Sequence, residues 1–310
     1  MTQKIACISL NLDSIGHAVG KSPLENDPTF NVVFKRIESI VDKYNIKISI
    51  FVIGKDLENK KNLNYVKEWF NKGHEIGNHT YTHPINFGYL DKKQIYEEIK
   101  KTDDLIFKAT NKKSEGFIAP NWNSSKNVLS VLNEFNYRYD HSLFSSPVLI
   151  LGLVKLFYNY LKVLITQRKP PQTYNLSGIF QRKDYLNMFI GKRKPFNTNN
   201  SYLKPNLNKD NITIYPIPNK LKLPYWLTID FVFPKKVADF IFKLNIKNND
   251  FFYLLIHPAD FLSKDDLVDV DGTHSFERMS IDLEYKVNLF EKRIKQLLDE
   301  GYKFKTFNKL

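Results

Sequence analysis

Short apolar runs alternate along the chain with segments in which apolar residues recur every three or four positions. The apolar runs predict buried strands at residues 4–11, 47–53, 74–77, 116–119 and 137–139. Helical spacing between these runs, as at Phe30, Phe34 and Ile37, predicts amphipathic helices. Strands that alternate with helices indicate a parallel sheet with right-handed crossovers.

This alternation breaks near residue 147 and resumes at residue 212. Residues 147–165 are apolar except for Lys155, Asn159 and Lys162, and a basic tract rich in asparagine and proline follows to residue 211. Further elements are expected as strands at 212–217, 251–256 and 302–307 and as helices at 235–244 and 276–300. We therefore predict one α/β domain over residues 1–310, with an insertion at about 147–211 that consists of an apolar helix and a basic tract.

Four polar side chains follow predicted strands at their carboxyl ends: Asp13, His79, Asn121 and Asp140. Because such ends meet at one rim of a parallel sheet, we expect a functional site there. His79 and His83 are four residues apart, so on a helical turn their imidazoles can reach one cation. An isolated pair with this spacing is more often structural than metal-binding, so a metal site here needs a third ligand.

Composition narrows the class of protein. With 310 residues and 42% hydrophobic content, the chain can bury a full core. Cys7 is the only cysteine, which excludes a disulfide framework and a cysteine-rich zinc site and favours a reducing compartment. No apolar signal segment with a cleavage site can be drawn at the N-terminus, so we expect a cytoplasmic protein.

Positive charge is concentrated in one segment. The net charge is +13, and 13 lysines and arginines against 2 aspartates between residues 148 and 222 supply +11 of it. The apolar run has two interpretations: a core or subunit-contact helix of a homo-oligomer, or an interfacial element on anionic lipid at the inner face of the membrane. Nucleic acid is not expected as a partner, because no recognisable reading motif accompanies the basic tract.

Five short motifs stand in order along the chain. They are Asn11-Leu12-Asp13, His79-Thr80-Tyr81-Thr82-His83, Phe117-Ile118-Ala119-Pro120, Tyr139-Asp140-His141-Ser142 and Leu255-Ile256-His257-Pro258. Together they resemble the motifs of the polysaccharide deacetylase family (NodB homology, carbohydrate esterase family 4), with a first motif of the Asp-x-Asp type. The resemblance spans residues 4–142 and 212–307. It implies a distorted (β/α) barrel of about seven parallel strands, with an inserted segment.

The resemblance also implies roles for individual residues. Asp13, His79 and His83 would hold one divalent metal ion, and a carboxylate with two imidazoles suits Zn²⁺. His257 would act as the general acid, with Asp140 tuning or orienting it. The implied reaction is hydrolysis of an N-acetyl or other small N-acyl group on an amino sugar of a glycan or lipid-linked envelope precursor.

The residues after the third motif are expected to bind the carbohydrate. Pro120, Asn121 and Trp122 would line this subsite, because an aromatic face suits a pyranose ring. Core packing is the alternative role for Trp122.

Two positions depart from the family pattern. Asn11 stands where the family has a second aspartate that serves as general base, and an amide cannot accept a proton at neutral pH. Ile118 replaces the arginine of the third motif. Two hypotheses follow: a hydrolase in which Asn11 only orients the water, or a catalytically degenerate glycan-binding protein.

Overall fold

The computed structural model describes residues 3–167, 180–206, 211–267 and 277–310. The chain divides into two compact units. The first consists of Met1–Thr82, Glu98–Phe117 and Tyr225–Leu310, and the second of His83–Glu97 and Ile118–Pro224. Parts of the predicted insertion, at 168–179 and 207–210, lie outside the described residues, as does residue 276 at the predicted start of the last helix.

A parallel sheet forms the centre of the first unit. Its strands follow the order β10-β1-β2-β3-β4, and β11 pairs with the start of β1. Their bounds are β1 Ile5–Leu12, β2 Ser49–Val52, β3 Glu75–Asn78, β4 Gly116–Phe117, β10 Phe251–Ile256 and β11 Lys303–Phe304. Every residue of β1 after Ile5 is buried, as expected for a strand that has neighbours on both edges.

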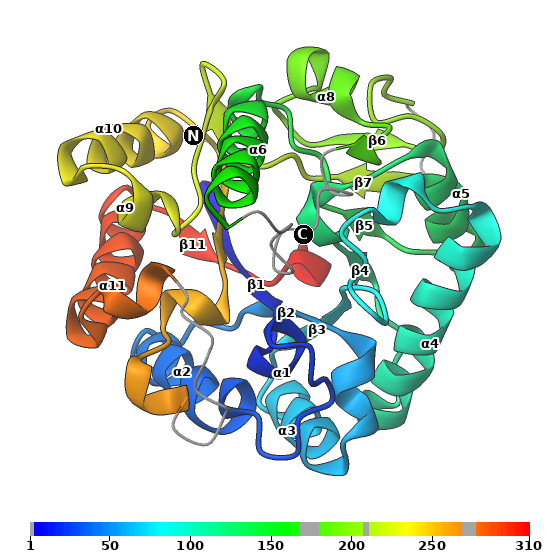
Figure 1. Ribbon diagram of the computed structural model, residues 1–310, viewed down its shortest axis with the longest axis horizontal. Helices are drawn as coiled ribbons and strands as arrows, with labels where there is room; N and C mark the ends of the chain where they lie inside the picture. Colours follow the sequence, from blue (N-terminus) through cyan, green and yellow to red (C-terminus); the bar gives the residue numbers. More distant parts are fainter. Residues whose placement is uncertain (1–2, 168–179, 207–210, 268–276) are drawn as a thin grey trace. The chain divides into compact units, whose positions relative to one another are not determined.

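Helices alternate with these strands along the chain. They are α1 Ile15–Ala18, α2 Phe34–Lys43, α3 Lys60–Asn71, α4 Lys92–Thr110, α9 Ile229–Val232, α10 Lys235–Ile246 and α11 Leu283–Asp299. In Figure 1, α2 and α3 lie beside the blue and cyan strands β1 to β3. The predicted alternation of parallel strands and helices is therefore confirmed for this unit.

The described residues of the second unit form a smaller set of strands and three α-helices. Strands β5 and β7 pair in parallel, β6 pairs antiparallel with β7, and β8 and β9 form a separate two-stranded sheet. The bounds are β5 Tyr139–Asp140, β6 Phe196–Thr198, β7 Ile212–Ile214, β8 Asn219–Lys220, β9 Leu223–Pro224, α5 Lys126–Glu134, α6 Val148–Gln167 and α8 Tyr185–Ile190. The apolar run of the sequence thus forms α6. Among the described residues, none of the helices has both the length and the apolarity needed to cross a bilayer.

Several elements differ from the sequence pattern, among them α11 and β6. Helix α11 begins at Leu283 rather than near residue 276, because the Asp282 side chain caps it by accepting a hydrogen bond from Tyr285 N at 2.8 Å. Glu277–Ser280 forms a separate 3-10 turn. Strand β6 is not predicted, since Phe196–Thr198 contains only one apolar residue.

Gly77 makes room for a core ring directly before the first histidine motif. It pairs with Phe51 across β3 and β2. A Cβ atom on Gly77 would lie 2.3 Å from Cε1 of Phe51, whose side chain is fully buried. Contacts this short do not occur, so a larger residue at position 77 requires the packed Phe51 ring to shift.

We expect Gly77→Ala to lower the free energy of unfolding by about 1–3 kcal/mol, because the Phe51 ring must shift in a packed core. Urea denaturation of Gly77→Ala measures this cost. Phe51→Leu removes the obstructing ring atoms, so the same glycine substitution should cost less in that background. An equal cost in both backgrounds would show that the ring is not the cause.

Candidate metal site

Asp13 and His79 meet at the carboxyl end of the first unit's sheet. Asp13 directly follows β1 and His79 directly follows β3. The Oδ1 atom of Asp13 lies 3.2 Å from Nε2 of His79, and the His79 side chain is 1% exposed against 32% for Asp13. A partly exposed carboxylate beside a buried imidazole leaves one side open to solvent.

His83 follows four residues after His79. One ligand atom from each of Asp13, His79 and His83 lies within 4.8 Å of the other two. One carboxylate oxygen and two imidazole nitrogens form a donor set typical of zinc and similar divalent ions. The structure thus brings together the three side chains that the sequence suggests as ligands, and their chemistry fits a divalent cation.

The turn between the two histidines is held by a carboxylate that the sequence analysis missed. Thr80 and His83 have positive φ angles of 67° and 54°, which are unfavourable for residues other than glycine. Glu98 Oε2 accepts hydrogen bonds from Tyr81 N at 2.9 Å and Thr82 N at 2.7 Å, and its Oε1 accepts one from Thr82 Oγ1 at 2.6 Å. These three bonds offset the backbone strain. Glu98 lies on α4, far from the motif in sequence, so no local pattern marks it.

The backbone after Asp13 is held by a second buried carboxylate. Asp27 Oδ2 accepts a hydrogen bond from Gly16 N at 2.7 Å, and Asp27 Oδ1 accepts one from Thr29 N at 2.8 Å. Burial raises the pKa of Asp27, although these hydrogen bonds favour its charged form. Asp27 thereby holds the backbone turn that follows Asp13.

His257 ends strand β10 on the same rim. Its Nε2 lies 4.0 Å from Asp13 Oδ2, and its Nδ1 lies 3.8 Å from Asp260 Oδ2. The His257 backbone N–H also donates to Asp260 Oδ2 at 2.9 Å. His257 is therefore positioned beside the candidate ligand Asp13, and Asp260 of the same turn holds its backbone.

Asp260 is fully buried and ionised. Burial opposes its charge, but the Arg278 guanidinium and the contacts with His257 outweigh that cost, so the pKa of Asp260 is lowered. Arg278 Nη1 donates to Asp260 Oδ1. Sequence reasoning missed Asp260, although an acidic residue three positions after a strand-end histidine is a readable signal.

Asn11 occupies the strand position two residues before Asp13. It is 5% exposed, and its Oδ1 has no hydrogen-bond partner among the described residues. Positions two apart on a strand face the same side, so the Asn11 amide shares the side of Asp13. An amide oxygen can orient a water molecule there but cannot take its proton.

Asp140 and Trp122 belong to the second unit. Asp140 Oδ1 accepts a hydrogen bond from Ser142 N at 2.9 Å, and its Oδ2 accepts one from Tyr202 OH. Burial raises the pKa of Asp140 to about 6, against these hydrogen bonds. Trp122 is 9% exposed and packs edge-on against Phe144, with ring centroids 4.9 Å apart, and its predicted role in the carbohydrate subsite stays a prediction.

The other residues proposed to bind the carbohydrate adjoin Trp122. Pro120 is buried, and Asn121 adopts a positive φ of 52°. The Asn121 carbonyl accepts a hydrogen bond from Arg182 Nη1 at 3.1 Å. Ile118, at the position of the family's arginine, is fully buried. The role of these residues in binding remains a prediction.

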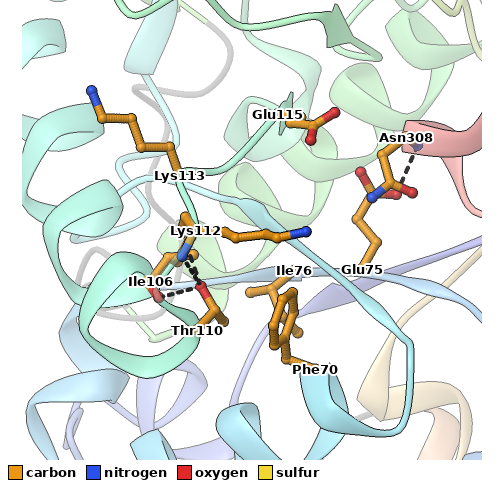
Figure 2. Close-up of a pocket in the computed structure, with 9 residues that line it drawn as sticks. All are labelled: Phe70, Glu75, Ile76, Ile106, Thr110, Lys112, Lys113, Glu115 and Asn308. Atoms are coloured by element: carbon orange, nitrogen blue, oxygen red, sulfur yellow. Dashed lines mark hydrogen bonds between the residues drawn. The ribbon is translucent and has the colours of Figure 1, made fainter.

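A small cavity lies at the opposite end of β3 from His79. Figure 2 shows Glu75 and Asn308 on one side of it and Thr110 and Lys112 on the other. Its volume is about 40 Å³, which is room for a water molecule rather than for a carbohydrate ring. The Glu75 carboxylate accepts hydrogen bonds from Ser49 Oγ at 2.5 Å and Asn308 N at 3.2 Å, so this end of the sheet is structural.

Comparison with known proteins gives partial matches in sequence. The family model described as polysaccharide deacetylase matches residues 22–139. A peptidoglycan-N-acetylglucosamine deacetylase of Bacillus cereus is 37% identical over 70 residues, which are 22% of this chain and 24% of that protein. A peptidoglycan deacetylase of Helicobacter pylori is 31% identical over 108 residues, which are 35% of this chain and 36% of that protein. The chain thus matches at most about a third of the length of these relatives.

A comparison of folds covers nearly the whole chain. A Mycobacterium smegmatis protein assigned to the polysaccharide deacetylases aligns with a TM-score of 0.56 and 13% identity, over 97% of this chain and 87% of that one. At this identity the match concerns the fold alone. The predicted α/β class with a distorted (β/α) barrel is confirmed.

We expect Glu98→Ala to weaken binding of Zn²⁺ by about 10- to 100-fold, because the turn between the two histidines loses three hydrogen bonds. Isothermal titration with the metal measures the affinity. Glu97→Ala, at the neighbouring exposed position on α4, is the matched control and should bind as the native protein does. Native affinity in Glu98→Ala would rule out this role.

We expect Asp140 to make stability depend on pH. A carboxyl whose folded pKa lies above its unfolded value stabilises the fold while it is protonated, and this contribution is lost as pH rises from about 4 through about 6. In the native protein, the free energy of unfolding should fall by an amount on the order of 3 kcal/mol across this pH range, and in Asp140→Asn this fall should be absent. Denaturant titration at a series of pH values measures both.

Tyr202→Phe is the control for that measurement. It removes a hydrogen bond to Asp140 but keeps the titrating carboxyl, so the fall in stability with pH should persist. Parallel stability curves for the native protein and Asp140→Asn would contradict the assignment.

Proposed function

We propose that the protein is a metal-dependent hydrolase of N-acylated amino sugars and a member of the polysaccharide deacetylase family, whose model matches residues 22–139. The observation that carries the proposal is the convergence of Asp13, His79 and His83 within 4.8 Å. These residues would hold one divalent ion, for which zinc is our choice on the donor set. When bound, such an ion polarises the amide carbonyl and acidifies water.

Our proposal for His257 is protonation of the leaving amine. Hydrolysis adds water oxygen to the acyl carbon, breaks the carbon–nitrogen bond, and requires a proton on the departing nitrogen. The Nε2 atom of His257 lies 4.0 Å from Asp13 Oδ2, and Asp260 holds the His257 backbone N–H. His257 is therefore placed to carry that proton, with Asp140 tuning or orienting it.

Asn11 determines how fast this reaction can run. It can position water through its amide oxygen, but the proton of that water has no carboxylate base at position 11. Loss of a general base typically costs about 10²- to 10⁴-fold in rate. We propose slow turnover rather than none, because the candidate ligands and the general acid are all present.

A second candidate function is glycan binding without turnover. It is favoured by one observation, the combined replacement of the family's base by Asn11 and of its arginine by Ile118. Such a protein would retain the metal ligands and the aromatic subsite at Trp122 but release no amine.

The substrate we propose is an envelope glycan or a lipid-linked precursor of one, carrying an N-acetyl or other small N-acyl group. The names of the Bacillus cereus and Helicobacter pylori relatives, both peptidoglycan deacetylases, support an envelope sugar. We place the reaction in the cytoplasm, at the inner face of the membrane, on the basis of cysteine use and charge.

We expect the native protein to release amine from N-acetylated oligosaccharides or lipid-linked sugars, and His79→Ala to abolish that release because a metal ligand is lost. Asn11→Asp should raise the rate by up to about 10²- to 10⁴-fold. An amine-release assay with added Zn²⁺ measures all three proteins. Asn64→Asp, an exposed position on α3, is the matched control and should leave the rate unchanged.

The same assay separates the two candidate functions. An inactive native protein that becomes active as Asn11→Asp supports the degenerate form. Activity that survives His79→Ala would sink the metal-dependent reaction.

A further inference from the structure

Helix α6 exposes a stripe of apolar side chains. Val154, Tyr158, Leu161 and Ile165 are 59%, 64%, 38% and 76% exposed, and we call these four residues the α6 stripe. Their spacing of four, three and four residues places them on one side of the helix. A helix of a globular unit normally buries such a stripe, but no described residue of the second unit covers this one.

A second apolar group lies close in the sequence and is linked to α6 by an aromatic contact. Phe180, 65% exposed, meets Phe157 of α6 edge-to-face, with ring centroids 6.1 Å apart. Five residues later α8 begins, and its Leu186, Phe189 and Ile190 are 57%, 54% and 62% exposed. We call these three residues the α8 patch.

The exposed charges of the segment that carries these two apolar groups, within its described residues from 148 to 206, all have one sign. Asp184 is the only acidic residue between residues 148 and 206, and it is buried in an ion pair with Arg182 at 2.8 Å. The exposed ionic side chains of the described part of this segment are Lys162, Lys183, Lys192, Arg193, Lys194 and Lys204. An apolar face accompanied only by exposed cations is complementary to an anionic, amphipathic surface.

We propose that the α6 stripe and the α8 patch form a docking surface for anionic lipid. The apolar side chains enter the boundary between headgroups and acyl chains, and the lysines and Arg193 meet lipid phosphates. Helix α6 would lie along the bilayer surface, because its exposed apolar side chains are on one side of the helix. A second copy of the chain is a poorer occupant, since two such faces would bring like charges together.

Lipid binding by this surface is compatible with the proposed function but does not depend on it. A lipid-linked sugar would be presented at the same bilayer, but lipid binding can be measured whether or not the protein turns over substrate. The two proposals can therefore fail separately.

Vesicle flotation with the full chain tests the surface. We expect the native protein to float with vesicles that contain phosphatidylglycerol and to bind phosphatidylcholine vesicles at least about tenfold more weakly. Tyr158→Gln combined with Ile165→Gln removes the most exposed part of the α6 stripe. Lys192→Gln, Arg193→Gln and Lys194→Gln together remove three cations, and each set should weaken binding about tenfold or more.

The control makes the same kind of substitution, exposed apolar residues to glutamine, in the first unit. Val237→Gln with Phe240→Gln alters two exposed apolar residues of α10, 41% and 59% exposed, and should leave flotation unchanged. Circular dichroism checks that each variant is folded. The proposal is overturned if the native protein does not float, if it binds both vesicle types equally, or if either variant set floats as the native protein does. Self-association of the native protein that is lost in Tyr158→Gln with Ile165→Gln, without lipid binding, would instead assign the face to a second copy.

Discussion

The arrangement of the candidate site depends on a constraint of parallel sheets: strands that run the same way end at the same rim. Strands β1, β3 and β10 are followed directly by Asp13, His79 and His257. Residues far apart in the chain are therefore brought within reach of one another, with Asp13 lying 3.2 Å from His79 and 4.0 Å from His257. The central position of β1, paired on both edges, makes Asp13 the common neighbour.

Buried or half-buried carboxylates hold the loops that carry these side chains. Glu98, Asp27 and Asp260 each accept backbone N–H groups of a turn next to a candidate functional residue. Hydrogen bonds from backbone amides to an ionised carboxylate are stronger than those to a neutral acceptor. A small number of such bonds is therefore enough to hold a strained turn. The three turns thus share one structural device, although none of these acids touches the proposed substrate.

The same rim explains why the replacement at position 11 is tolerated by the fold. Asn11 is nearly isosteric with aspartate and lies on β1, so the strand pairs as it would with a carboxylate. Removing a second negative charge beside Asp13 also removes like-charge repulsion at a buried position. Asparagine at position 11 therefore preserves the stability of the fold but removes the group that could accept a proton.

The sequence by itself determined the order of strands and helices, the apolar character of α6, and the candidate residues Asp13, His79, His83 and His257. The order of the elements follows from periodicity, which is a local property, and the roles of the four residues follow from the resemblance of the five motifs to those of the polysaccharide deacetylase family. The tertiary structure alone decided that Glu98 and Asp260 support the turns, that Trp122 is buried, and that the α6 stripe is exposed. Such facts depend on which elements, distant in the sequence, pack together. The spacing of apolar residues along a helix is the same whether or not a neighbouring element covers them.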